Sequence, residues 1–496
     1  MNEVENESAL SAGISPEWQQ ADDPLPDTAV DCWQRTALTT KYGSKICGGL
    51  SVYLHRLRIQ GVRGFYGSRA VDLRFERSPE DEDFYKRYKG FCVIAGRNGS
   101  GKTTLLRAAA TALAGPEVAN SLTEGDRDWI SHGQTVATVN AEIVRDFYEV
   151  NLGTGRPADV FSAALKWERT EGARARPQAD TRRGRGGKMA ERSLWSPKPT
   201  GWFAAGYGPF RRLAGTSGEV ARLMAGDWTA ARFITLFREE ASLAETVQWL
   251  QQVNYRARSG RAGYAELEER VIGLLNDGLF PDGYLVDRVD PDGLWITKES
   301  GSPVRIDEMS DGYRTVTALI TDIVRQINEC FDGKIEWSKD GRAVLLTSGV
   351  VLIDEIDVHL HVSWQKRIAP WLLKHFPYIQ FIVTSHSPYI CQSASPGGLI
   401  QLPGPEEEFP PRIAKDELFR RVVNGSGDDA VLTELFGLDS PYSERVDELR
   451  TALTRLERLA IRGQASPEDL ARLTELSEAL SPSPGSRVRD VLGDDV

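Results

Sequence analysis

The amino-acid sequence predicts an α/β fold with a mixed, mostly parallel sheet and flanking helices. Three short runs, at residues 91–95, 350–353 and 381–384, are continuously apolar, which is typical of strands that are buried on both faces. Stretches with helical periodicity follow the first run and separate the second from the third. Because strands and helices alternate, we expect parallel strands with helical crossovers, together with a helical lobe and a C-terminal helical segment.

The elements divide the chain into six segments. Alternating apolar residues predict a first strand at 52–59, and the run AVDLRF predicts a second one. The sequence YLVDRV-DPDG-LWITKE predicts a hairpin within residues 283–306. The segments are a polar extension (1–48), a first lobe (49–165), an insertion (166–200), a helical region (201–282), a second lobe (283–400) and a C-terminal helical segment (401–496).

The insertion at residues 166–200 is rich in Arg, Gly and Pro and has almost no aliphatic residues. Such a segment cannot bury enough apolar area to offset its ordering entropy, so we expect it to be disordered. It is also the most basic stretch of the chain. It is therefore either a solvated linker or a nucleic-acid-binding arm.

The charge of the chain limits its function. The 496 residues include 60 Lys and Arg against 71 Asp and Glu, a formal net charge of −11. Because phosphate neutralisation needs a basic face, this balance argues against a protein that coats nucleic acid, and any DNA contact must be local.

The sequence predicts a cytoplasmic protein without a membrane contact. No window approaches the roughly 18 consecutive apolar residues of a membrane span, and the acidic start MNEVENESAL lacks the features of a secretory signal. The five cysteines lie far apart and form no C-x-x-C pair, as is typical of reduced thiols.

A phosphate-binding loop is predicted directly after the first apolar run. Gly96-Arg97-Asn98-Gly99-Ser100-Gly101-Lys102-Thr103 matches G-x-x-x-x-G-K-[ST] and leads into a helix. Glycines let the backbone turn tightly, so that N–H groups converge on a phosphate at the positive end of the helix. We expect Lys102 to neutralise the β- and γ-phosphates and the Thr103 hydroxyl to bind Mg²⁺. Thr104 completes this predicted ATP–Mg²⁺ site.

Two further strand ends carry polar residues of the same site. Asp354 and Glu355 follow the second apolar run, where one carboxylate can bind the metal and the next can polarise a water. We expect Asp354 to be the metal ligand and Glu355 the general base. His386 follows the third apolar run and is expected to contact the γ-phosphate or the attacking water.

A second anion site is predicted at the helix that begins near Ser310. The hydroxyl of Ser310 and the N–H of Gly312 lie at this helix N-terminus. Two distant helix N-termini of one subunit cannot normally bind the same phosphate. The pattern therefore predicts a dimer in which one subunit completes the site of the other.

These four elements, in this order, resemble those of the ABC-type ATPases, the class that includes the SMC, RecF and OLD proteins, over about residues 50–395. The run DEIDVHLHVSWQ resembles the form DE-x-x-x-HLHP-x-WQ of the RecF/OLD-like branch. The runs MSDGYR and GYGPFRR resemble predicted ATPases of bacterial anti-phage systems, such as the Septu PtuA-like proteins. The resemblance implies a P-loop NTPase fold of ABC type that binds and hydrolyses ATP.

Three residues depart from the patterns of this class. Asp311 stands where the transporter-type signature has its second glycine, and Val362 replaces the proline that usually follows HLH. His361 occupies the position of an aspartate in the SMC loop that crosses to the other subunit, so we expect that contact to differ. Gln134 is a candidate for the glutamine that links the metal to lobe movement.

Two kinds of function are compatible with these motifs. The first is a regulatory ATPase, a homo-oligomer built from ATP-sandwich dimers, which controls a partner effector such as an HNH nuclease in anti-phage defence. The second is a RecF-like DNA repair ATPase that binds DNA directly. The basic residues available for such a contact are those of the Arg-rich insertion and the pair Arg211-Arg212. We favour the first.

A nuclease domain within the chain is not expected. About 110 residues follow His386, and their acidic positions do not follow apolar strands. This part predicts two amphipathic helices between about residues 443 and 481, which either pack on each other and on the core or form an assembly and effector-docking element. Their apolar stripes are Val446, Leu449, Leu453 and Leu456 on the first helix and Leu470, Leu473 and Leu480 on the second.

Overall fold

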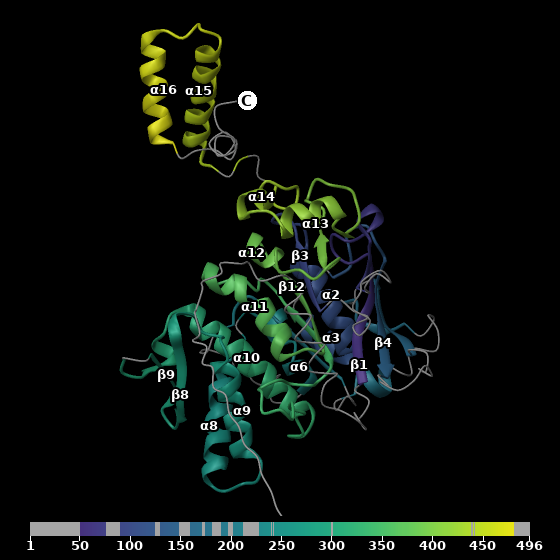
Figure 1. Ribbon diagram of the computed structural model, residues 1–496. Coiled ribbons are helices and arrows are strands. Elements are labelled where there is room, and N and C mark those ends of the chain that lie inside the picture. Colours follow the sequence, from purple (N-terminus) through teal and green to yellow (C-terminus); the bar gives the residue numbers. More distant parts are fainter. Residues whose placement is uncertain are drawn as a thin grey trace, which may run out of the picture. The chain divides into compact units, whose positions relative to one another are not determined.

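The computed structural model of the chain is shown in Figure 1. The predicted extension at residues 1–48 lies outside the described residues. The structure describes residues 50–75, 90–124, 129–147, 159–170, 174–180, 190–196, 202–211, 228–239, 241, 243–298, 301–437, 440 and 442–480.

A six-stranded sheet forms the centre of the fold, in the order β14-β13-β3-β12-β11-β7. Neighbouring strands from β13 to β7 are parallel, and β14 is antiparallel to β13. The predicted α/β class with a mixed, mostly parallel sheet is confirmed. The strands are β3 (Phe91–Ala95), β7 (Phe203–Tyr207), β11 (Gly349–Ile353), β12 (Ile379–Thr384), β13 (Leu399–Gln401) and β14 (Arg412–Ile413).

The two faces of this sheet belong to different hydrophobic cores. In β3, Cys92 and Ile94 pack in one core, whereas Phe91 and Val93 pack in the other. Because successive side chains of a strand point to opposite faces, a strand covered on both sides must be apolar at every position. This explains the continuous apolar runs of the sequence.

A five-stranded antiparallel sheet, β2-β1-β4-β5-β6, shares one of these cores with α2 (Lys102–Ala114). Two buried side chains of the central sheet region bind the backbone of β1. The Ser348 hydroxyl accepts a hydrogen bond from the N–H of Val52 at 2.6 Å, and the Gln380 amide accepts one from the N–H of Leu54 at 2.9 Å. The strands are β1 (Leu50–Gln60), β2 (Val71–Arg74), β4 (Val136–Phe147), β5 (Asp159–Glu168) and β6 (Gln178–Ala179).

Helices and a hairpin form the other core. Figure 1 shows α10 and α11 on one side of β12 and strands β1 and β4 on the other, in agreement with the two cores. The predicted hairpin is present as β8 (Tyr284–Asp290) and β9 (Gly293–Lys298). The long helices of this core are α8 (Ala244–Arg258), α9 (Tyr264–Asn276), α10 (Asp311–Cys330) and α11 (Val362–His375).

Shorter elements complete the sheets and cores. They include α3 (Pro116–Leu122), α6 (Trp228–Ala231), α7 (Ile234–Phe237), β10 (Val304–Arg305), α12 (Pro388–Cys391), α13 (Asp416–Val423) and α14 (Gly427–Val431). No helix within the described residues is long and apolar enough to cross a membrane. Cys92, Cys330 and Cys391 form no disulfide there.

The prediction that residues 201–282 are helical is wrong at β7, which pairs with β11 along its whole length. The run FAAGY has few of the β-branched residues that favour strands. Its small residues instead permit close packing, since a Cβ on Gly206 would lie 2.9 Å from Cδ2 of Leu236. The residues of β7 therefore favour a strand here through close packing against α7, and not through a high intrinsic preference for strands. The C-terminal segment 401–496 likewise contains a short strand, β14.

The disorder predicted for residues 166–200 does not extend to residues 166–170, where β5 ends, or to residues 174–180 and 190–196. Residues of β6 pair with β5, and Ala190 and Leu194 are buried. The indole Nε1 of Trp195 donates a hydrogen bond to the carbonyl oxygen of Ala112 in α2 at 2.8 Å. A few apolar anchors thus hold this Arg-rich segment against the first lobe.

The two predicted C-terminal helices are α15 (Glu444–Ile461) and α16 (Pro467–Ala479). Ser466 and Asp469 form a capping box at the start of α16. The helices pack on each other, yet Ile461 is 79% and Leu470 47% exposed. Their pairing therefore leaves apolar surface uncovered.

Candidate functional site

The phosphate loop, Gly96 to Thr103, connects β3 to α2. Gly99 and Gly101 have φ angles of 77° and 97°, which side chains with a Cβ rarely adopt. A Cβ on Gly101 would also lie 2.9 Å from the ring of Phe65. The first turn of α2 contains no acidic residue. The helix N-terminus therefore keeps its positive potential for an anion.

Lys102 lies within the loop that it is expected to serve. Its ammonium group donates hydrogen bonds to the carbonyl oxygens of Gly96 at 2.8 Å and Arg97 at 3.1 Å. Burial lowers its pKa to about 8, although the nearby carboxylates of Asp354 and Glu355 act in the opposite direction. A bound phosphate would supply the counter-charge that this buried ammonium needs.

Ser100 supplies a second observation that fits a phosphate ligand. Its side chain is almost completely buried, and its hydroxyl has no hydrogen-bond partner in the described structure. An unpaired buried hydroxyl is costly unless a ligand completes it. The loop thus combines backbone N–H groups, an ammonium group and a hydroxyl.

The acid pair Asp354 and Glu355 follows β11 and is fixed by a residue of β12. The hydroxyl of Thr384 donates to Oδ1 of Asp354 at 2.5 Å and accepts from the N–H of Glu355 at 2.7 Å. Ile353 lies opposite Val383 in the parallel register, which places the two strand ends together. Thr384 was not predicted as a site residue, because a threonine at the end of an apolar strand is ordinary in sequence.

Glu355 has an unusual backbone. Its φ of 45° lies in the left-handed region, which is uncommon for residues other than glycine and clusters at functional sites. Burial raises the pKa of its half-buried carboxyl group, and the neighbouring carboxylates of Asp354 and Asp357 add to this effect. Both influences favour proton acceptance, the property of a general base.

Arg211 binds the backbone of the acid pair. Its Nη1 donates to the carbonyl oxygen of Asp354 and its Nη2 to that of Glu355, both at 3.0 Å. The side chain is buried, and burial lowers its pKa to about 10. Buried in this way, Arg211 is not available for the DNA contact that the RecF-like alternative would draw from the pair Arg211-Arg212, and Arg212 lies outside the described residues.

His386 follows β12 and lies near the charged groups of the phosphate loop and the acid pair. Burial lowers its pKa, and the positive charge of Lys102 lowers it further, while Asp357 and Asp354 oppose both. The lowered pKa favours the neutral imidazole at pH 7, which can donate a hydrogen bond through one ring nitrogen and accept one through the other. Asp357, which perturbs several groups of the site, was not predicted.

The second predicted anion site lies at the start of α10. Ser310 is the exposed N-cap residue, and its side chain makes no capping hydrogen bond. A Cβ on Gly312 would lie 2.6 Å from Trp364 and 2.8 Å from the carbonyl oxygen of His359, so glycine is required there. Within the described structure, no hydrogen bond or ion pair joins Ser310 or Gly312 to the phosphate loop.

Two other predicted residues have local roles. Gln134 lies in the turn before β4, where its N–H donates to the carbonyl oxygen of Ser131. The role of Gln134 in linking the metal to lobe movement stays a prediction. His361 caps α11, with its side chain accepting from the N–H of Ser363.

A magnesium ion fits the residues at the end of β11 and the start of α2. The Asp354 carboxylate is nearly fully buried, and Thr103 is partly exposed beside Lys102. Mg²⁺ in nucleotide sites typically uses one or two protein ligands and completes its shell with phosphates and water. Among the described residues, no group of three or more His, Cys, Asp or Glu could hold a metal by itself.

Family models match both halves of the chain. Residues 56–181 match a model described as "AAA domain", and residues 236–392 match one described as "AAA domain, putative AbiEii toxin, Type IV TA system". The first match contains the phosphate loop, and the second contains Ser310, the acid pair and His386.

Curated relatives share parts of the chain. The "Retron Ec83 probable ATPase" of Escherichia coli is 42% identical over 98 residues, which are 20% of this chain and 17% of the relative. The "Septu protein PtuA" of Bacillus mycoides (strain KBAB4) is 25% identical over 300 residues, or 60% of this chain and 34% of the relative. The chain thus spans about a third or less of the length of these relatives.

A solved SMC head bound to the C-terminal winged-helix domain of ScpA shares 17% identity, with a TM-score of 0.38, and covers 73% of this chain and 97% of that structure. At this score the likeness adds nothing to the topology described above. The family models and curated relatives confirm the resemblance to ATPases with defence-associated relatives that the motifs predict.

Proposed function

We propose that this chain binds ATP–Mg²⁺ and hydrolyses it slowly to ADP and phosphate. ATP closes a dimer of two chains, the unit of a homo-oligomer, and hydrolysis opens it. The opening and closing hold or release a partner effector, such as an HNH nuclease, in anti-phage defence in the cytoplasm.

This proposal rests mainly on one observation: the carboxyl ends of three strands lie at the same edge of the sheet. β3, β12 and β11 are parallel neighbours, so that the phosphate loop, His386 and the acid pair follow adjacent strands. Ligands of open α/β sheets bind outside the carboxyl ends of the strands. Burial lowers the pKa of Lys102, and the carboxylates of Asp354 and Glu355 oppose this effect by raising it. Burial raises the pKa of Glu355, and the charge of Lys102 opposes this effect by lowering it.

The chain's own residues can perform each task of hydrolysis. When ATP binds, the Lys102 ammonium group replaces its hydrogen bonds to the loop carbonyls with contacts to the β- and γ-phosphates. The N–H groups of the loop orient these phosphates. Thr103 and Asp354 would hold Mg²⁺, which when bound neutralises phosphate charge. Glu355 accepts a proton from the attacking water, and neutral His386 orients the γ-phosphate or that water.

The proposed composite site can be tested with two inactive variants. Lys102→Ala removes the phosphate-loop cation, and Ser310→Arg blocks the anion site at the start of α10. In a mixed dimer, the intact phosphate loop of one subunit faces the intact Ser310 of the other, which restores one site. We expect an equal mixture to recover on the order of a quarter of wild-type turnover, given random pairing.

The control for this experiment is each variant alone, which should stay inactive at the same total concentration. Mixed dimers are verified by two affinity tags purified in succession. Absence of turnover in verified mixed dimers would show that Ser310 and Lys102 do not serve the same site across subunits.

The helices α15 and α16 are proposed to form the assembly or effector-docking element. Their apolar stripes are partly exposed after they pair, and two helices alone form only a small core. We expect a chain truncated after Asp439 to keep ATP turnover and to lose assembly beyond the dimer or effector binding. The measurements are turnover, mass in solution and co-purification with the effector. Unchanged assembly and effector binding would refute the docking role.

The alternative function, direct DNA binding as in RecF-like proteins, has less support. Arg211 is buried, and the described parts of the Arg-rich insertion include the buried anchors Ala190 and Leu194. A DNA-binding function would give an affinity that falls steeply with salt concentration.

A further inference from the structure

The chain segment after β7 follows a fixed path beside the acid pair. Tyr207 lies opposite Ile353 in the parallel register, and its carbonyl oxygen accepts a hydrogen bond from the N–H of Asp354 at 2.8 Å. A Cβ on Gly208 would lie 2.1 Å from the carbonyl oxygen of Thr235. Only glycine permits this approach to α7, while the pairing of Tyr207 places the start of the segment beside the end of β11.

The guanidinium group of Arg211 then joins the two strand ends. Nη1 donates to the carbonyl oxygens of Asp354 at 3.0 Å and of Gly208 at 3.1 Å, and Nη2 donates to that of Glu355 at 3.0 Å. The side chain is only 2% exposed. A planar guanidinium presents its donors in a rigid fork, so it can fix several carbonyls at once.

The backbone at Glu355 needs such support. Its φ of 45° is a conformation that residues other than glycine rarely adopt and that persists only where the surroundings enforce it. Thr384 fixes the N–H side of Glu355, and Arg211 fixes the carbonyl side. The peptide units on both sides of the general base are thus held by two buried side chains, one at the end of β12 and one in the segment after β7.

We propose that Arg211 is a positioning residue that holds the turn at Glu355, so that the carboxylate stays directed at the nucleotide. The inference rests on the proposed ATP hydrolysis by Glu355. A purely electrostatic role, in which Arg211 merely neutralises the acid pair, would require a positive charge but no fork. Arg211→Lys separates the two roles, because lysine keeps the charge and loses the fork.

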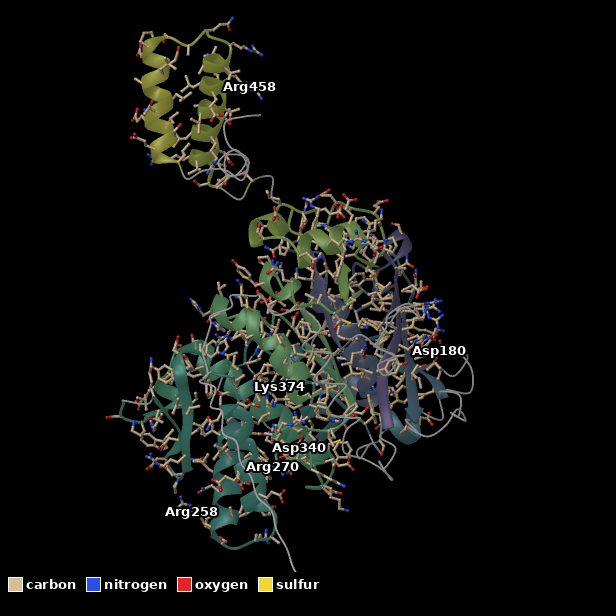
Figure 2. All side chains as sticks on the ribbon, in the orientation of Figure 1. Asp180, Arg258, Arg270, Asp340, Lys374 and Arg458 are labelled. Carbon is tan, nitrogen blue, oxygen red and sulfur yellow. The ribbon has the colours of Figure 1, made fainter. Side chains whose placement is uncertain are left out.

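The test measures the rate constant kcat, the KM for ATP and the affinity for ATP of the full chain. We expect Arg211→Lys to lower kcat about 10- to 100-fold, the effect of a small misplacement of a catalytic group, with ATP affinity within about threefold of wild type. An affinity near that of wild type also demonstrates a folded phosphate loop. Arg270→Lys, on α9 (Figure 2), removes another arginine–carbonyl hydrogen bond and should leave kcat unchanged.

A double variant distinguishes an effect of Arg211 that acts through Glu355 from a general loss of structure. In the Glu355→Gln background, Arg211→Lys should cause no further loss in long single-turnover incubations, because Arg211 acts through Glu355. Wild-type kcat in Arg211→Lys, or an equal further loss in the double variant, would overturn the inference. A wild-type chain without ATP turnover would overturn the proposed function, and this inference with it.

Discussion

Replacing Lys102 by alanine is expected to abolish ATP binding and therefore all turnover. Lys102 is the buried cation of the phosphate loop, and its ammonium group already lies among the loop carbonyls of Gly96 and Arg97. Removing one partner of a desolvated charge pair typically costs about 2–5 kcal/mol, which corresponds to a loss of affinity of about 30-fold to several thousand-fold. Equilibrium binding of a fluorescent ATP analogue, with and without Mg²⁺, measures this loss.

Lys374→Ala is the matched control for that variant. Lys374 is an exposed lysine that pairs with Asp277 on the surface, where an ion pair contributes little (Figure 2). Its replacement should leave ATP affinity unchanged. ATP binding by Lys102→Ala at the wild-type level would show that the loop from Gly96 to Thr103 does not hold the nucleotide.

Replacing Glu355 by glutamine is expected to preserve ATP binding and to stop hydrolysis. The amide is nearly isosteric with the carboxyl group but cannot accept the proton of the attacking water. Loss of a general base typically lowers a rate about 10²- to 10⁴-fold. The phosphate loop and Asp354 remain, so the variant should accumulate bound ATP. Single-turnover assays with labelled ATP measure both quantities.

Glu266→Gln, at an exposed position of α9, controls for the change of charge. It should hydrolyse ATP at the wild-type rate. If Glu355→Gln also turned over ATP at the wild-type rate, Glu355 would not be the general base, and Asp357 would be the next residue to test.

The motif residues of the site were predictable because each motif lies within one short stretch of sequence. The phosphate loop follows a continuously apolar strand, as do the acid pair and His386, and parallel strands bring their carboxyl ends to one edge. The order and type of these elements therefore predicted one site at the strand ends, whereas the order of the strands in the sheet comes from the structure. The same apolar runs correctly predicted strands covered on both faces.

The residues that hold the site were not predictable, because their partners are distant in sequence. Thr384 contacts a carboxylate 30 residues earlier, and Arg211 reaches a carbonyl 143 residues later. Neither interaction leaves a local pattern. β7 was missed for a related reason. Its small residues have a low intrinsic preference for strands, and what they permit is close packing against α7, which is distant in the pattern of the sequence. Arg211 therefore appeared to be a surface charge.

The measurement that tests the account most directly is the mass in solution of the Glu355→Gln variant, determined by light scattering with and without ATP–Mg²⁺. Because this variant should retain ATP, the composite site predicts that its mass doubles on addition of ATP. The same change should be absent when Ser310→Arg is added to the variant. An unchanged mass while bound ATP is at saturation would contradict the proposal that ATP joins two subunits.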